Sequence, residues 1–192
     1  YYGYCAFMDA RGENPVPLER YRRLDLEGFL GSSYTKTLDK SLEENPDTVS
    51  VYIPFTGHEF IVYDGTEARE AEVIDLQYAD SKTDKYLVFI STGVGTWSVI
   101  KTAVKNGQRI LVIKDSFGNA LVPFLLPHYE EIYIVDSRFY SIGATGKNIL
   151  QFIEDNGINE VLFMHYMEDV NWHAFMEGVQ ALMGMDSEAT AD

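Results

Sequence analysis

The 192-residue sequence has few of the residues that build disulfide frameworks or metal sites. It contains one cysteine, Cys5, and four histidines. A single cysteine excludes an internal disulfide and any metal site with several cysteine ligands, and no spacing of His, Asp and Glu is typical of a metal site. The phosphate-binding pattern Gly-Lys-Ser/Thr does not follow the glycines Gly93 and Gly95. We therefore expect no metal and no other cofactor.

Positive charge and long hydrophobic runs are also scarce. Acidic residues outnumber basic residues by 30 to 15, which gives a net charge of −15 at pH 7. This charge repels phosphate backbones and anionic membrane surfaces, so we expect no nucleic-acid partner. No stretch is apolar for long enough to span a bilayer, so membrane attachment would need an anchor outside this chain. The sequence does not indicate an oligomeric state.

Aromatic residues, in contrast, are abundant. They make up 14% of the chain, with 13 tyrosines and 11 phenylalanines, and 46% of all residues are hydrophobic. This composition argues against disorder and supplies a sizeable core. Aromatic or apolar residues at positions 1, 4, 7 and 8 would share one face of a helix. A helix this apolar, with no N-cap before it, is typical of the middle of a longer protein, so we expect that residues upstream of Tyr1 are missing.

The first half of the chain shows the pattern of short strands. Three segments alternate polar and apolar residues between turn residues, which predicts an antiparallel meander with one solvated face. These segments are residues 49–53, 58–63 and 71–76. Two more strands are predicted at 86–90 and 97–102, and Asn106-Gly107 after them is a hairpin signal. Residues 18–48 are interpreted as a long connection with one short helix or strand.

The second half repeats a strand–helix unit three times. The predicted strands are 109–113, 132–135 and 161–164, and the predicted helices are 117–126, 147–155 and 171–183. Such a repeat predicts a parallel sheet with right-handed crossovers. We therefore predict a single domain over residues 1–192, with a parallel α/β core at about 86–184 and a β-rich insertion at about 49–76.

Asp115 and Ser116 lie where the first of these strands ends and the next helix begins. In parallel sheets ligands collect at the carboxyl ends of strands, and the first N–H groups of a helix favour negative charge. Ser116 can therefore attack a carbonyl carbon while its own backbone N–H holds the oxyanion. The alternative is that Asp115 or Ser116 simply caps the helix, which is a very common role.

Other polar residues near strand ends are candidate supporting groups, each with a structural alternative. Asp136 and Arg138 follow the second strand, and their alternative is a surface ion pair. His165 ends the third strand, and its alternative is a histidine at the edge of the core. Asp169 and His173 are four residues apart, which suits an Asp–His pair that orients a general base. The alternative for this pair is a solvated helix start.

The run Lys114-Asp115-Ser116-Phe117, within residues 112–125, resembles the bacterial DHHW family. This family is related to SGNH (GDSL-type) hydrolases and to alginate O-acetyltransferases. The resemblance continues over most of the chain, in residues 1–4, 15–18, 128–132, 135–140, 148–150 and 157–163. It implies a three-layer, SGNH-like (flavodoxin-like) α/β fold and an extracellular or cell-surface location in bacteria.

The resemblance also implies roles for single residues. Ser116 corresponds to the SGNH nucleophile, and Gly93 and Asn119 would support the oxyanion or the turn of the serine. Lys114 stands where SGNH enzymes have glycine. The Asp–His pair of this branch precedes the serine, so the DHHW motif is expected just before Tyr1.

Two functions follow from these observations. The first is a serine esterase or O-acyltransferase that acts on cell-envelope carbohydrate, with the upstream His as base or, as an alternative, His173 with Asp169. The second is a catalytically inactive surface module that binds glycan or protein through its aromatic residues. Departures from the SGNH oxyanion pattern favour the second function, whereas an ordered Asp–His pair at Ser116 would favour the first.

Overall fold

The computed structural model describes residues 1–90, 93 and 95–184, with only the backbone of residues 169, 170 and 174. These residues form two compact units, each assembled from two segments of the chain. The first unit comprises Tyr1–Phe55 and Ala71–Gly93. The second unit comprises Thr56–Glu70 and the described residues that follow position 94.

The first unit begins with the expected aromatic helix, α1 (Tyr2–Ala10). Tyr4 and Met8 are fully buried, one turn apart, and the Tyr4 hydroxyl accepts the Val16 N–H at 2.7 Å. The unit also contains a separate two-stranded antiparallel sheet of β1 (Arg22–Phe29) and β2 (Asp47–Ile53). The sequence interpretation allowed one short helix or strand in residues 18–48, whereas the structure has several elements there, among them β1, in which charged residues dominate the exposed positions.

Short helices complete the first unit. They are η1 (Leu18–Arg20), α2 (Gly31–Thr37), η2 (Lys40–Glu43), η3 (Leu76–Tyr78) and η4 (Lys85–Val88). The prediction of a strand at 86–90 is wrong, because η4 occupies most of this segment. The ammonium group of Lys85 is buried and donates to the Ala79 carbonyl oxygen. Only Phe89 forms a β-bridge, to Ile74.

The second unit contains a mixed six-stranded sheet in the order β4-β3-β5-β7-β6-β8. Its strands are β3 (His58–Asp64), β4 (Glu67–Ala71), β5 (Trp97–Thr102), β6 (Arg109–Lys114), β7 (Glu131–Asp136) and β8 (Glu160–Met164). Strand β6 runs parallel to β7 and to β8. Strand β5 is antiparallel to both β3 and β7. The chain is therefore α/β, with parallel pairing confined to one side of the sheet.

Three expectations for this region need correction. A wholly parallel sheet is wrong, because β3 and β5 extend it in antiparallel fashion. The segment 49–76 is not one β-rich insertion, because β2 pairs with β1 whereas β3 and β4 join the large sheet. The hairpin around Asn106-Gly107 is also wrong, because β7 lies between β5 and β6. Glu130, just before β7, bonds to both ends of this connection: its carbonyl oxygen accepts the Thr102 N–H and its carboxylate accepts the Gly107 N–H.

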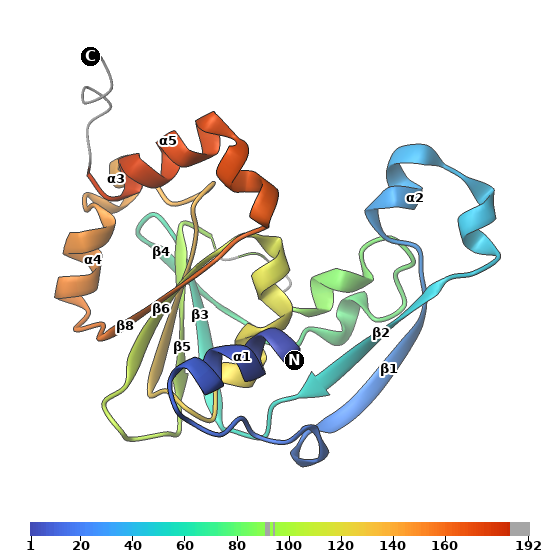
Figure 1. Cartoon of the computed structure of the whole chain (residues 1–192), viewed down its shortest axis with the longest axis horizontal. Coiled ribbons are helices and arrows are strands. Elements are labelled where there is room, and N and C mark those ends of the chain that lie inside the picture. Colours follow the sequence, from blue (N-terminus) through green and yellow to red (C-terminus); the bar gives the residue numbers. More distant parts are fainter. Residues whose placement is uncertain (91–92, 94, 185–192) are drawn as a thin grey trace. The chain divides into compact units, whose positions relative to one another are not determined.

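Helices cover both faces of the parallel strands. They are η5 (Ser116–Ala120), η6 (Val122–Leu125), α3 (Ile142–Thr145), α4 (Ile149–Asp155), η7 (Met167–Asn171) and α5 (His173–Leu182). Figure 1 shows α4 on one side of the sheet and the segment 116–126 on the other. That segment is two short 3₁₀ helices instead of the single helix expected, and Pro123 within η6 lacks the N–H that a continuous helix needs.

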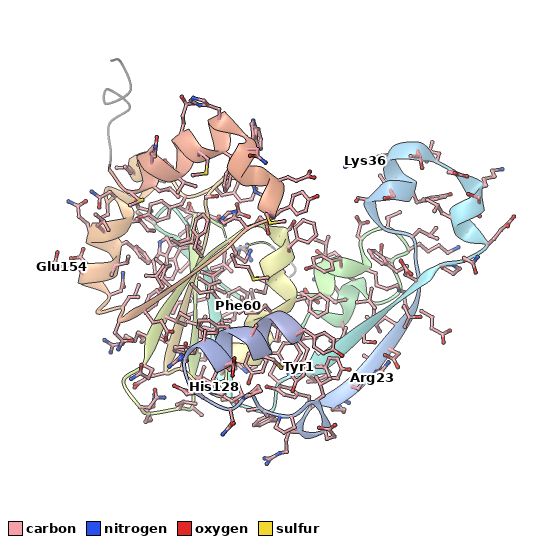
Figure 2. The ribbon with its side chains drawn as sticks, in the orientation of Figure 1. Tyr1, Arg23, Lys36, Phe60, His128 and Glu154 are labelled. Atoms are coloured by element: carbon pink, nitrogen blue, oxygen red, sulfur yellow. The ribbon has the colours of Figure 1, made fainter. Side chains whose placement is uncertain are left out.

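The core of the second unit lies on both faces of the sheet. One face packs aliphatic and aromatic residues of β6 and β7 against α4 and α5, with Phe152 of α4 at its centre. The rings of Trp97, Tyr133 and Tyr140 meet Phe152 edge-on at 5.2, 5.8 and 5.9 Å. Figure 2 shows Phe60 of β3 in the interior and Glu154 pointing outward from α4. Among the described residues, no helix is both long and apolar enough to cross a membrane.

Candidate functional site

Ser116 begins η5 one residue after the buried strand β6 ends, and its side chain is exposed. The apolar run of residues 110–113 fixes this position, because all four side chains are buried in the sheet. The carboxyl ends of the parallel strands β7 and β8 meet the same edge of the sheet. The structure thus brings Ser116, Asp136, Arg138 and His165 to that edge, as the strand pattern predicted.

Asp115 is the residue that caps η5. Its Oδ1 atom accepts the Phe117 N–H at 2.8 Å, and its Oδ2 atom accepts the Tyr166 N–H at 2.8 Å. The cap predicted for Asp115 or Ser116 therefore belongs to Asp115. Since the cap comes from its neighbour, Ser116 is not the residue that holds the helix start.

The rings of Phe117 and Tyr166 stack beside the serine, with centroids 5.4 Å apart. Phe117 is 62% exposed and Tyr166 is 45% exposed. The Asp115 carboxylate accepts the backbone N–H of both residues, so the ends of β6 and β8 present an aromatic surface next to Ser116. Phe139, after β7, adds another exposed ring, and the Arg138 guanidinium lies 5.2 Å from its centroid.

Asp136 and Arg138 form an ion pair that is only partly at the surface. Asp136 is 3% exposed. The Arg138 guanidinium donates to both of its carboxylate oxygens, at 2.8 and 2.6 Å, and the Arg138 backbone N–H donates at 3.1 Å. Such a bidentate pair fixes the orientation of the carboxylate. The structural alternative was a surface ion pair. The pair is confirmed, but Asp136 is buried and does not lie at the surface.

Lys114 is the functional candidate whose role the sequence interpretation missed. It is 2% exposed and lies in register with Asp136 of β7. Burial lowers the pKa of Lys114 from 10.5 to about 8, against the opposing effect of the Asp136 and Asp115 charges. The sequence did carry a signal for its burial. Lys114 is two residues after Val112 and four after Ile110, so in a strand it lies on the same buried face of the sheet as they do.

Asn119 lies within η5 and is buried. Its Oδ1 atom has no hydrogen-bond partner among the described residues. A buried amide group near Ser116 suits the predicted support of an oxyanion or of the turn, and that role stays a prediction. Gly93 belongs to the first unit, so its predicted contribution to an oxyanion site stays a prediction as well.

The remaining histidines have different environments. The His165 ring lies between Phe163 and Phe175, with centroids 4.5 and 4.8 Å away, which suits the structural alternative of a histidine at the edge of the core. The side chain of His173 is 87% exposed and pairs with Glu177 at 3.2 Å. The side chain of Asp169 lies outside the described part of the chain, so the predicted Asp169–His173 pair stays a prediction. Within the described residues, no group of His, Cys, Asp and Glu is arranged to hold a metal ion.

Three solved structures are similar to this chain. A DHHW family protein from Eubacterium siraeum is 29% identical and superposes with a TM-score of 0.81, over 94% of this chain and 59% of that one. Bacillus cereus PatB1 with a sulfonyl adduct is 26% identical, with a TM-score of 0.67, over 85% of this chain and 55% of that one. A second PatB1 structure, at 23% identity, has a TM-score of 0.64 over 85% and 56% of the two chains.

The chain thus spans somewhat more than half the length of the structures it matches. A search of the curated proteins finds no match. The family model for the DHHW protein matches residues 1–135, which include β6, Ser116 and most of β7. This match covers well over half of the chain. The chain therefore belongs to the DHHW family.

Proposed function

We propose that this chain carries the serine of an SGNH-like esterase or O-acyltransferase that acts on cell-envelope carbohydrate outside the bacterial cell. The observation that carries the proposal is the exposed Ser116 at the carboxyl end of a buried parallel strand, with its turn held by Asp115. A serine in this place attacks an acyl carbon, and the backbone N–H of Ser116 would hold the developing oxyanion, because the Phe117 N–H is already bonded to the Asp115 cap.

The likeness to PatB1 supports this proposal. That protein has been solved with a sulfonyl adduct, and sulfonyl reagents form such adducts with nucleophilic side chains. The reaction also needs a general base. The family resemblance assigns it to a histidine of the DHHW motif, whereas His165 and His173 are the alternatives in this chain.

Labelling with a fluorophosphonate probe tests the nucleophile. The probe should modify Ser116, as located by mass spectrometry of the digested protein, and Ser116→Ala should abolish the modification. Ser32→Ala, which removes an exposed serine of the first unit, should leave it unchanged. The E. siraeum relative should be labelled in parallel. If only the relative reacts, its base comes from the part of the fold that this chain does not span. If neither reacts, the esterase proposal is wrong.

The exposed aromatic residues favour a second candidate, a surface module that binds glycan. Several large apolar side chains at or near this edge of the sheet are solvent-exposed: Phe117, Phe139, Tyr166, Met167 and Trp172. Aromatic faces of this kind stack on the apolar faces of other rings. Intrinsic fluorescence during titration with cell-wall polysaccharide would detect such binding. It should weaken in Phe117→Ala, whereas Phe55→Ala, which removes an exposed ring of the first unit, should have no effect.

A further inference from the structure

Lys114 lies inside the protein directly next to the serine turn. Only 2% of Lys114 is exposed. A lysine is seldom buried to this extent unless a charged group lies nearby. A Cβ atom built on Gly118 would lie 2.7 Å from both Cβ and Cδ of Lys114. The aliphatic part of Lys114 therefore packs against the turn that carries Ser116, with no space between them.

The groups around Lys114 are mostly charged. Asp136 of β7 is its register partner and is 3% exposed, and Asp115, next in the chain, is 6% exposed. Arg138, which is paired with Asp136, adds a positive charge that lowers the pKa of Lys114. On the other side β8 contributes Met164, and η5 contributes Gly118, neither of which carries a charge. No hydrogen bond or ion pair joins the ammonium group to a described residue, so the charges of Asp136, Asp115 and Arg138 act on it through space.

The charges of this edge cancel only when Lys114 is protonated. Asp115 and Asp136 supply two negative charges, and Lys114 and Arg138 supply two positive ones. Loss of the Lys114 charge leaves one negative charge in excess beside Ser116. Attack by a serine oxygen builds further negative charge at the same place, and poor screening in the interior makes the repulsion costly.

We propose that Lys114, as an ammonium ion, is a positioning residue that balances the buried Asp115 and Asp136 carboxylates and so permits negative charge to develop at Ser116. This inference rests on the proposed function of Ser116 as a nucleophile. It assigns a role to the residue that replaces the usual SGNH glycine, in addition to its packing against Gly118.

The rate of fluorophosphonate labelling tests the charge balance. Lys114→Met keeps most of the side-chain volume and should slow labelling of Ser116 by about tenfold or more. Lys114→Met combined with Asp136→Asn restores neutrality and should recover most of the rate, which a packing defect would not do. Lys105→Met, at an exposed lysine paired with Glu130, is the control. The rate of the wild type relative to Lys114→Met should fall as the pH rises through about 8.

A second measurement does not require a reactive serine. The titration of the Lys114 side chain can be followed by NMR of protein with ¹³C-labelled lysine. Its pKa should be about 8 in the wild type and lower in Asp136→Asn, because the Asp136 charge raises it. The inference is overturned if folded Lys114→Met labels at the wild-type rate, if the double variant fails to recover, or if Asp136→Asn leaves the Lys114 titration unchanged. A wild type that never labels counts against the proposed function, and the NMR titration then decides the charge balance alone.

Discussion

The carboxylate of Asp115 joins the ends of two parallel strands, because its Oδ2 atom accepts the Tyr166 N–H at 2.8 Å while its Oδ1 atom caps η5. One side chain thus sets the position of the serine turn relative to β8. Tyr166 also stacks on Phe117, so the same carboxylate organises the aromatic surface.

Asp115→Ala should therefore destabilise the protein by about 2 kcal/mol, because two backbone N–H groups lose a charged acceptor. Urea denaturation measures the loss, and amide hydrogen exchange should become faster at Phe117 and Tyr166. Asp39→Ala is the matched control, since Asp39 caps η2 through one exposed hydrogen bond to the Ser41 N–H. Its cost should be below about 1 kcal/mol. Equal costs for the two variants would show that Asp115 is no more than an ordinary cap.

Gly118→Ala should destabilise the protein by about 1–3 kcal/mol, the usual range for overpacking. The added methyl group would meet Lys114 Cβ, which cannot move away without its strand. Gly178→Ala is the opposite case, because Gly178 lies in α5 with open space around its Cβ position. That change should be neutral or stabilise the helix by up to about 1 kcal/mol. Thermal unfolding of both variants measures these changes in stability. If Gly118→Ala is as stable as the wild type, the turn that carries Ser116 can shift to accommodate the methyl group.

The stability of the protein should depend on pH through Lys114. Its pKa is lowered by burial to about 8 in the folded state, from 10.5 otherwise. Between these values the unfolded chain binds a proton that the folded chain has released, so the free energy of unfolding rises with pH. Relative to Lys114→Met, the wild type should gain about 3 kcal/mol across this window. Urea denaturation at several pH values measures the difference.

Buried tyrosines act in the opposite direction above about pH 10. Burial raises the pKa of Tyr133, as does its hydrogen bond to Glu131. The folded state then keeps a proton that the unfolded state has lost, and stability falls with pH. This effect is common to the wild type and Lys114→Met and cancels in their difference. A difference that stays constant from pH 7 to 10.5 would contradict the lowered pKa of Lys114.

Phe152→Ala should cost about 3–5 kcal/mol, because three aromatic rings pack edge-on against Phe152 in the core of the second unit. Leu150→Ala, two residues away on the exposed side of α4, should cost less than about 1 kcal/mol. Chemical denaturation followed by tryptophan fluorescence suits this test, since Trp97 contacts Phe152. Similar costs for both variants would mean that α4 contributes little to the core.

The sequence predicted the parallel strands and the position of Ser116 well. Strands β6, β7 and β8 are apolar runs with clear turns, and α4 and α5 lie where they were expected. The pairing of distant segments could not be predicted in this way. Residues 58–64 show the alternation of a strand, but alternation does not identify a partner, and β3 pairs with β5 more than thirty residues later.

The charged residues of the site show the same limit. The capping role of Asp115 follows from its place before a helix, whereas its bond to Tyr166 depends on tertiary structure. Lys114 looked like a simple departure from the SGNH glycine. Its inward direction follows from its spacing with Ile110 and Val112, whereas its pairing in register with Asp136 depends on tertiary structure.

The division of each unit between two chain segments constrains the order in which the protein can be completed during synthesis. Strand β3 leaves the ribosome before its partner β5, and the remainder of the first unit is made between them. Until β5 and β7 emerge, the hairpin of β3 and β4 has no sheet to join, and its buried residues Phe60 and Val62 remain in contact with water. We therefore expect the second unit to fold late and cooperatively, because the sheet that carries Ser116 can be completed only after its last strand, β8, has been made.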